Sequence, residues 1–235
     1  MKIDPNTILD VRQLNKSVNL GSKTIDILQN VNLEVNAGET IAIVGSSGSG
    51  KTTLLSIIAG LDIPTGGEVF LKGQALHSAD EELRAQIRGD YVGFIFQQFL
   101  LIPSLTAKEN IMLPAELSNM PNAEEMAQEL LEKVGLGQRG DHFPSQLSGG
   151  EQQRVAIARA FITKPDILFA DEPTGNLDNQ TGAQIENLLF ELHEQAGTTL
   201  VVVTHDPKLA ERCQRQVVMD NGHLTEQSPK LVEVV

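Results

Sequence analysis

The stretch TIAIVGSSGSGKTTLLSIIAG, residues 40–60, decides the fold. Its first five residues form a short apolar run rich in β-branched side chains, which predicts a buried strand. The eight residues that follow, Gly45 to Thr52, match the pattern G-x-x-x-x-G-K-[ST], and the apolar segment after Thr53 predicts a helix. We therefore expect a strand, a glycine-rich loop and a helix in direct succession, which is the arrangement of a phosphate-binding loop.

Each part of this loop has a chemical task. Its three glycines let the backbone curl so that successive N–H groups point into one concavity, to which the helix start adds its positive end. Lys51 is expected to reach the β- and γ-phosphates of a nucleotide, and the Thr52 hydroxyl to bind Mg²⁺. A glycine-rich turn with an accidental lysine is the alternative, which the full match between strand and helix disfavours. The predicted nucleotide-binding residues are Gly45, Ser46, Ser47, Gly48, Ser49, Gly50, Lys51, Thr52 and Thr53.

Two further apolar runs end in residues that suit phosphate chemistry. The run 167–170 leads into Asp171 and Glu172, and the run 199–203 ends just before His205. Open α/β sheets bind ligands at the carboxyl ends of their strands, so these side chains are expected at one edge. Asp171 is predicted to hold Mg²⁺, Glu172 to deprotonate the attacking water, and His205 to contact the γ-phosphate or that water. Without the phosphate loop, two adjacent acids would more often be a solvated turn or a helix start.

Strand and helix patterns alternate along the chain, which predicts an α/β protein with a phosphate-loop core. The runs 8–14, 28–35 and 68–72 alternate or turn tightly, and they predict a mainly antiparallel N-terminal β subdomain. The middle of the chain, about 79–161, is rich in helical patterns and is predicted to be an inserted α-helical subdomain. Its clearest amphipathic segment is 123–134.

Composition and charge limit the classes of function. The formal net charge of −13 argues against nucleic-acid binding, because such affinity depends on Lys and Arg that neutralise phosphates. It also argues against adhesion to anionic lipid. No run approaches the roughly 18 apolar residues of a membrane span, and the first residues lack the apolar stretch of a signal peptide. We expect one domain, 1–235, in the cytoplasm, which a protein partner would have to hold at any membrane.

The segment LSGGEQQR, residues 147–154, allows two interpretations. Ser148 and Glu151 form the S-x-x-E pattern of a capping box, so the segment can be an ordinary helix start. Gly149 and Gly150 do not fit that explanation fully, because glycine destabilises a helix relative to alanine. They are better explained if something approaches the bare backbone, and a helix N-terminus with a Ser hydroxyl suits a phosphate.

LSGGEQQR resembles the signature sequence of ABC ATPases. It occurs here with the phosphate loop, the acidic strand end and His205 in the order of that family, over a match from about residue 8 to 226. The resemblance implies that Gln97 lies in a Q-loop that contacts Mg²⁺ and water. It also implies that GNLD, residues 175–178, forms a D-loop, with Asp178 among the nucleotide-binding residues.

The same resemblance implies a head-to-tail dimer. In such a dimer, ATP on the phosphate loop of one subunit meets the segment Ser148 to Gly150 of the other. This chain has one phosphate loop and one signature segment, so two chains would complete two composite sites. We therefore expect an ATP-dependent homodimer that uses ATP and Mg²⁺.

One position departs from the family. ABC ATPases usually stack an aromatic residue against adenine, whereas counting back from the run 27–31 puts Val18 near that position. The whole chain has one Tyr and no Trp. Base–aromatic stacking contributes roughly 1–3 kcal/mol in single-strand binding proteins, so its loss predicts weak discrimination between ATP and GTP.

Further segments resemble the branch of lipoprotein-release, macrolide-export and cell-division ATPases. They are GFIFQ at 93–97, LLIP at 100–103, LTA at 105–107 and GNLD at 175–178. The branch implies a permease with few membrane spans and a large extracytoplasmic domain at a bacterial inner membrane, with room for an extracytoplasmic protein partner. Two rival functions stay open: a soluble P-loop ATPase that acts on DNA or ribosomes, and the ATPase of a solute importer.

The apolar segment 99–105 follows Gln97 almost directly. In this family a helix of the permease reaches that region. Packing of the segment against the protein's own core is the alternative, and the sequence favours neither.

Overall fold

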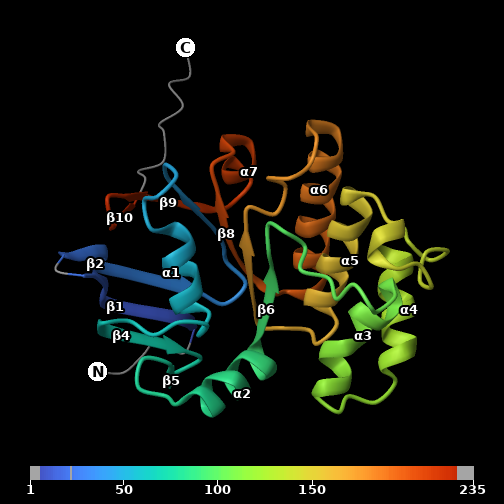
Figure 1. Cartoon of the computed structure of the whole chain (residues 1–235), viewed down its shortest axis with the longest axis horizontal. Helices are drawn as coiled ribbons and strands as arrows, with labels where there is room; N and C mark the ends of the chain where they lie inside the picture. The colour runs from blue at the N-terminus through green and yellow to red at the C-terminus, as the bar shows by residue number, and fades with distance from the viewer. Residues whose placement is uncertain (1–5, 22, 227–235) are drawn as a thin grey trace.

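The computed structural model describes residues 6–21 and 23–226 and shows two β-sheets with helices between and beside them (Figure 1). The strands are β1 (Thr7–Leu20), β2 (Lys23–Asn36), β3 (Thr40–Val44), β4 (Gly66–Leu71), β5 (Gln74–Ala75), β6 (Val92–Ile95), β7 (Ile167–Asp171), β8 (Thr199–Thr204), β9 (Arg215–Asp220) and β10 (His223–Glu226). The helices are α1 (Lys51–Ile58), α2 (Glu81–Tyr91), α3 (Ala107–Leu117), α4 (Ala123–Lys133), the 3₁₀ helix η1 (Pro144–Gln146), α5 (Gly149–Phe161), α6 (Asn179–Ala196) and α7 (Pro207–Glu211). The predicted α/β class is confirmed. Within the described ranges, no helix combines the length and hydrophobicity that a membrane span requires.

The first sheet is antiparallel, with the strand order β2-β1-β4-β5. β1 pairs with β2 on one side and with β4 on the other. The antiparallel β subdomain predicted from the alternating runs is therefore confirmed. β1 extends six residues past Leu14, the last predicted position, because it continues with β2 as a hairpin whose residues are half-buried or exposed. A strand that no longer packs against the core has no reason to alternate between apolar and polar residues.

The second sheet has the order β10-β9-β3-β8-β7-β6, and its neighbours are parallel except for the β10–β9 pair. The predicted strand 40–44 is confirmed as β3, and the strands predicted at 167–170 and 199–203 each extend one residue farther. After β8 the chain crosses to the other side of β3, where β9 pairs with it. The strand order thus reverses at β3, and open α/β sheets bind ligands beside such a reversal, at the carboxyl ends of the strands.

The parallel sheet is covered on both faces, as its continuous apolar strands require. Because successive residues of a strand point to opposite faces, Leu168 and Ala170 of β7 belong to one apolar core, whereas Ile167 and Phe169 belong to the other. The first core includes α3 to α6, and the second includes α1 and the antiparallel sheet. Figure 1 shows α1 between the two sheets, with α5 and α6 beyond the parallel sheet. This packing fixes the carboxyl ends of β3, β7 and β8 beside one another at one edge of the sheet.

The helical part of the chain begins later than the predicted range 79–161. β6 lies inside that range, yet it pairs with β7 at the edge of the parallel sheet. Helix α2 also belongs with the preceding part, because its Ile87 joins the core that contains α1. Helices α3, α4 and α5 pack on one another beside the sheet, and α6 packs on α5. A strand of four residues is too short for its periodicity to stand out among neighbouring helices.

Candidate nucleotide-binding site

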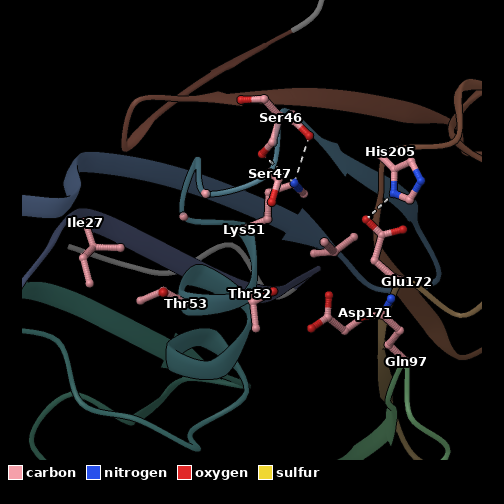
Figure 2. Close-up of a pocket in the computed structure, with 14 residues that line it drawn as sticks. Ile27, Ser46, Ser47, Lys51, Thr52, Thr53, Gln97, Asp171, Glu172 and His205 are labelled. Carbon is pink, nitrogen blue, oxygen red and sulfur yellow. Dashed lines mark hydrogen bonds and ion pairs between the residues drawn. The ribbon is translucent and has the colours of Figure 1, made fainter. Parts of the chain in front are cut away.

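A pocket lies at the carboxyl edge of the parallel sheet, between the loop after β3 and the ends of β7 and β8 (Figure 2). Its volume of about 740 Å³ is within the range of about 300–1,000 Å³ that ligand pockets have. Of the predicted site residues, the pocket is lined by Gly45, Ser46, Ser47, Gly48, Gly50, Lys51, Thr52, Thr53, Gln97, Asp171, Glu172 and His205. Segments that are far apart in the sequence therefore meet at one site.

The loop after β3 requires glycine at two positions. A Cβ on Gly45 would lie 2.2 Å from the carbonyl oxygen of Met219, and one on Gly50 would lie 2.9 Å from that of Ile27. Gly50 also has φ of 108°, which other residues rarely adopt. As the N-cap of α1 it provides no side-chain hydrogen bond, so the first N–H groups of this helix are left for a ligand.

Lys51 is folded back onto the loop. It is 8% exposed, and its Nζ donates hydrogen bonds to the carbonyl oxygens of Gly45 and Ser46 at 2.8 and 2.9 Å. An ammonium group has three N–H donors, so one remains for a phosphate oxygen. The hydroxyl of Ser49 is buried and has no hydrogen-bond partner among the described atoms. Ser49 is the one predicted residue of the loop that does not line the pocket, so the fit to an anion rests on Lys51 and on the first N–H groups of α1.

Thr52 and Asp171 provide oxygen ligands for a cation. Burial, and after it the charge of Glu172, raises the pKa of the Asp171 carboxyl, while a hydrogen bond with the Thr52 hydroxyl works in the opposite direction. Mg²⁺ usually takes one or two protein oxygens, with phosphate oxygens and waters completing its octahedron. A hydroxyl, one carboxylate and the nearby amide of Gln97 fit that requirement.

Glu172 and His205 are paired. The Oε1 atom of Glu172 lies 2.8 Å from Nδ1 of His205, and the glutamate side chain is 16% exposed whereas the histidine is 71% exposed. Glu172 has φ of 46°, a left-handed conformation that costs about 1–3 kcal/mol in a non-glycine residue. Its N–H donates to the carbonyl oxygen of Val203 at the end of β8. The strained backbone thus holds the carboxylate at the pocket, against a titratable ring.

Gln97 is in contact with the first two residues of the segment 175–178. Nδ2 of Asn176 donates to the carbonyl oxygen of Gln97 at 2.7 Å, and a Cβ on Gly175 would lie 3.0 Å from Nε2 of Gln97. Asp178 is placed differently. It caps α6 by accepting from the N–H groups of Gln180 and Thr181, and it does not line the pocket of its own chain.

Ser148, Gly149 and Gly150 also lie outside the pocket of their own chain. Ser148 is exposed and forms the predicted capping box with Glu151, whose carboxylate accepts from the Ser148 N–H at 2.8 Å. Packing within the chain explains why residue 150 is glycine, and the sequence did not indicate this. A Cβ on Gly150 would lie 2.5 Å from Cγ2 of Thr181. Our explanation that something approaches its bare backbone is therefore not needed for Gly150. A Cβ on Gly149 would make only ordinary contacts, so that glycine stays unexplained by packing.

The residue at the far end of the pocket is Ile27, which the sequence did not indicate. Figure 2 shows it beyond Thr53, on the side away from Glu172 and His205. Val18, which we expected near the base, pairs with Ile25 in the hairpin and does not line the pocket. β2 therefore contributes an aliphatic side chain to this end of the pocket.

Each of the two interpretations of the apolar segment 99–105 fits part of it. Leu101 is half-buried against the core that contains α3 to α6, as the packing alternative requires. Leu100 and Ile102 are 52% and 37% exposed, and they leave apolar surface available to a partner.

A phosphate loop facing an acidic strand end, with a pocket of this size between them, defines a P-loop nucleoside triphosphatase. A model of the ABC transporter family matches residues 28–175. The ABC transporter ATP-binding protein YbbA of Escherichia coli (strain K12) is 58% identical over 223 residues, covering 94% of this chain and 98% of that protein. The lipoprotein-releasing system ATP-binding protein LolD of Shewanella oneidensis is 50% identical over 221 residues, covering 93% of this chain and 96% of that protein.

A solved structure agrees with these relatives. The dimeric bacterial ABC transporter cassette MJ0796 is 42% identical, with a TM-score of 0.86 over 93% of this chain and 98% of that chain. The chain therefore belongs to the ABC transporter family and is one of its ATP-binding, ATP-hydrolysing proteins. The resemblance to the lipoprotein-release branch is confirmed. A likeness to YbbA, indicated by LLIPSL at 100–105, LPA at 113–115 and FADE at 169–172, is confirmed as well.

Proposed function

We propose that this chain is the motor of an ABC complex in a bacterial inner membrane, where ATP closes a homodimer and the closure drives a permease. The observation that carries the proposal is the separation of two predicted ATP contacts. The phosphate loop lines the pocket, whereas Ser148 and Gly149 lie outside it, with Ser148 exposed and Gly149 half-buried. A second chain would complete the site by placing its own signature segment over the nucleotide.

The pocket supports a division of labour among its residues. Lys51 and the start of α1 would bind the phosphates, with Thr52, Asp171 and Gln97 around Mg²⁺, which when bound would neutralise charge on the transferring phosphoryl group. Glu172 would take the proton of the attacking water, with His205 holding the carboxylate in place.

Dimer formation is supported by the surface and by a relative. Ser148 is exposed at the N-terminus of α5, and a further side chain at Gly149 would meet nothing closer than 3.5 Å, so both can approach a partner. The cassette MJ0796, which shares this fold, is described as dimeric in its ADP- and phosphate-bound structure. We place Asp178, at the start of α6, near this dimer interface as well.

The permease would dock beside the Q-loop. Leu100 and Ile102 expose apolar surface within a few residues of Gln97, so a helix bound there could sense the nucleotide. Because the chain is similar to YbbA and LolD, we expect the permease that the resemblance to their branch implies, with few spans and a large extracytoplasmic domain. With a net charge of −13, attachment to the cytoplasmic face would come from that protein, and an extracytoplasmic protein would join through the permease.

The test is copurification in a trapped state. Glu172→Gln protein with MgATP, extracted from membranes in detergent, should bring with it a permease with few spans and a large extracytoplasmic domain. Lys51→Ala protein, which lacks a phosphate ligand, should recover less of that permease. Recovery of a substrate-binding protein without such a permease would overturn the proposal, and so would binding of DNA or ribosomes in place of any membrane protein.

A further inference from the structure

The turn that follows Gln97 is strained. Phe99 has φ of 51° and Leu100 has φ of 48°, so two consecutive non-glycine residues adopt the left-handed conformation. Such residues persist only where the surrounding structure holds them. Phe99 lies two residues after Gln97, whose side chain lines the nucleotide pocket. A group that holds this turn therefore also affects the site.

Arg159 of α5 holds this turn. Its Nη1 donates to the carbonyl oxygen of Leu100 at 2.6 Å, and its Nη2 donates to that of Phe99 at 2.8 Å. Burial lowers the pKa of Arg159, and no neighbouring carboxylate in the described part of the chain opposes that shift. Arg159 is half-buried, and its guanidinium has two backbone carbonyl groups as partners. Both carbonyl groups belong to the left-handed residues, so the contact acts directly on the strained turn.

The turn is tied to the pocket at its other end. The carbonyl oxygen of Gln97 accepts a hydrogen bond from Asn176, and the N–H of Leu100 donates to the carbonyl oxygen of Gln98. The segment from Gln97 to Leu100 is therefore a compact unit held at both ends by side chains. Freeing one end would allow Gln97 to leave its position at the pocket.

Helix α5 is itself fixed to the catalytic edge. Nε2 of Gln153, a fully buried residue of this helix, donates to the carbonyl oxygen of Pro173, which directly follows Glu172. α5 begins at the signature segment, so one helix contacts both the residue after Glu172 and the turn after Gln97. A helix anchored in this way can present Arg159 at a constant place.

We propose that Arg159 is a positioning residue: its guanidinium holds the turn Phe99–Leu100 and thereby keeps Gln97 in the nucleotide pocket. The inference rests on the role proposed above for Gln97 at Mg²⁺ and water. Arg159 itself does not line the pocket, so it would act on hydrolysis only through the turn.

A double-mutant cycle with Gln97 tests this coupling. Arg159→Lys keeps the charge but cannot serve both carbonyls in the same geometry, and it should lower kcat for MgATP by about 10- to 100-fold, as a misplaced group of the site does. KM should change little, because the phosphate loop is untouched. In a Gln97→Ala background the same substitution should cost nothing further, since the group that Arg159 positions is gone.

A second pair of variants separates positioning from stability. Leu100→Asn in the Arg159→Lys protein should restore kcat, because asparagine tolerates the left-handed conformation better than leucine. Leu100→Ala, the matched control, should not restore it. Wild-type kcat in Arg159→Lys, equal loss in both Gln97 backgrounds, or equal behaviour of the two Leu100 variants would overturn the inference. Absence of hydrolysis in the unmodified chain would instead overturn the proposed function.

Discussion

Two helices of this molecule, α1 and α5, begin at glycine-rich segments, and the two helix starts differ in their surroundings. α1 begins after Gly50 without a side-chain cap, inside a pocket lined by Lys51, Asp171 and Glu172. α5 begins after Ser148 with a complete capping box and lies outside that pocket, with Ser148 exposed. Both helix N-termini suit a phosphate. The first start therefore belongs to the pocket of its own chain, whereas the second lies outside that pocket and, as we propose, contributes to the site of a second chain.

The largest expected effect comes from removing the base in the α1 pocket. Glu172→Gln keeps the size of the side chain but cannot accept a proton, so turnover should fall about 10²- to 10⁴-fold. Binding of MgATP should persist, because the phosphate loop is unchanged. Phosphate release and equilibrium nucleotide binding measure the two quantities. Glu211→Gln, an exposed glutamate at the end of α7, serves as the control and should leave both unchanged. Near-normal hydrolysis by Glu172→Gln protein would refute the role of Glu172.

The two signature glycines should respond in opposite ways. Gly150→Ala would place Cβ 2.5 Å from Thr181 and should lower the free energy of unfolding by about 1–3 kcal/mol, as overpacking does. Adding Thr181→Ser removes the clashing methyl group, keeps the hydroxyl that binds Asp178, and should restore stability.

Gly149→Ala should keep stability, because its new methyl group would make only ordinary contacts with Leu177 and Phe99. It should lower the hydrolysis rate if, as we propose, the nucleotide of a second chain approaches this helix start. Urea unfolding and phosphate release separate the two outcomes. Equal loss of stability in Gly149→Ala would mean that both glycines serve packing alone.

A smaller effect is expected at the base. Ile27→Ala removes the aliphatic surface at the far end of the pocket and should weaken ATP and GTP binding equally, by roughly 1–2 kcal/mol. Ile25→Ala, an exposed position of the same strand outside the pocket, is the control. Competition binding with both nucleotides measures the ratio. A strong preference of the unmodified chain for ATP would contradict the weak base discrimination expected of an aliphatic side chain at this end of the pocket.

The smallest effect concerns pH. Since burial raises the pKa of Asp171 above the ordinary 3.8, the ionised carboxylate destabilises the folded state at neutral pH. This destabilisation is lost as the pH falls through the raised pKa, where the carboxyl is protonated. Asp171→Asn should therefore stabilise the nucleotide-free protein most at neutral pH and progressively less in acid. Urea unfolding over that pH range measures it, and a gain that is constant with pH would contradict the assigned cause.

The sequence predicted those features whose signal is local. β3 and the phosphate loop form one contiguous pattern. The strands before Asp171 and before His205 are continuous apolar runs, which are typical of a sheet covered on both faces. The capping box at Ser148 likewise lies within four residues. Their position at the carboxyl edge of the sheet brings the phosphate loop, Asp171, Glu172 and His205 to one pocket, which Ser148 does not line.

The features that the sequence missed depend on contacts between distant residues. Ile27 reaches the pocket because β2 crosses the loop at Gly50, and Gly150 must be glycine because Thr181 lies against it. Arg159 looks like a surface residue of a helix until the turn at Phe99 is placed beside it. No local pattern marks such contacts, since each is created by the packing of α5 and the sheets.

The most direct test of the divided site is the mass of Glu172→Gln protein in solution, measured by light scattering with and without MgATP. The account predicts a monomer without nucleotide and a dimer with MgATP, and it predicts that Gly149→Ala in the same protein reduces the dimer fraction. A monomer under both conditions, even when the membrane partner is supplied, would contradict the claim that two chains complete the site.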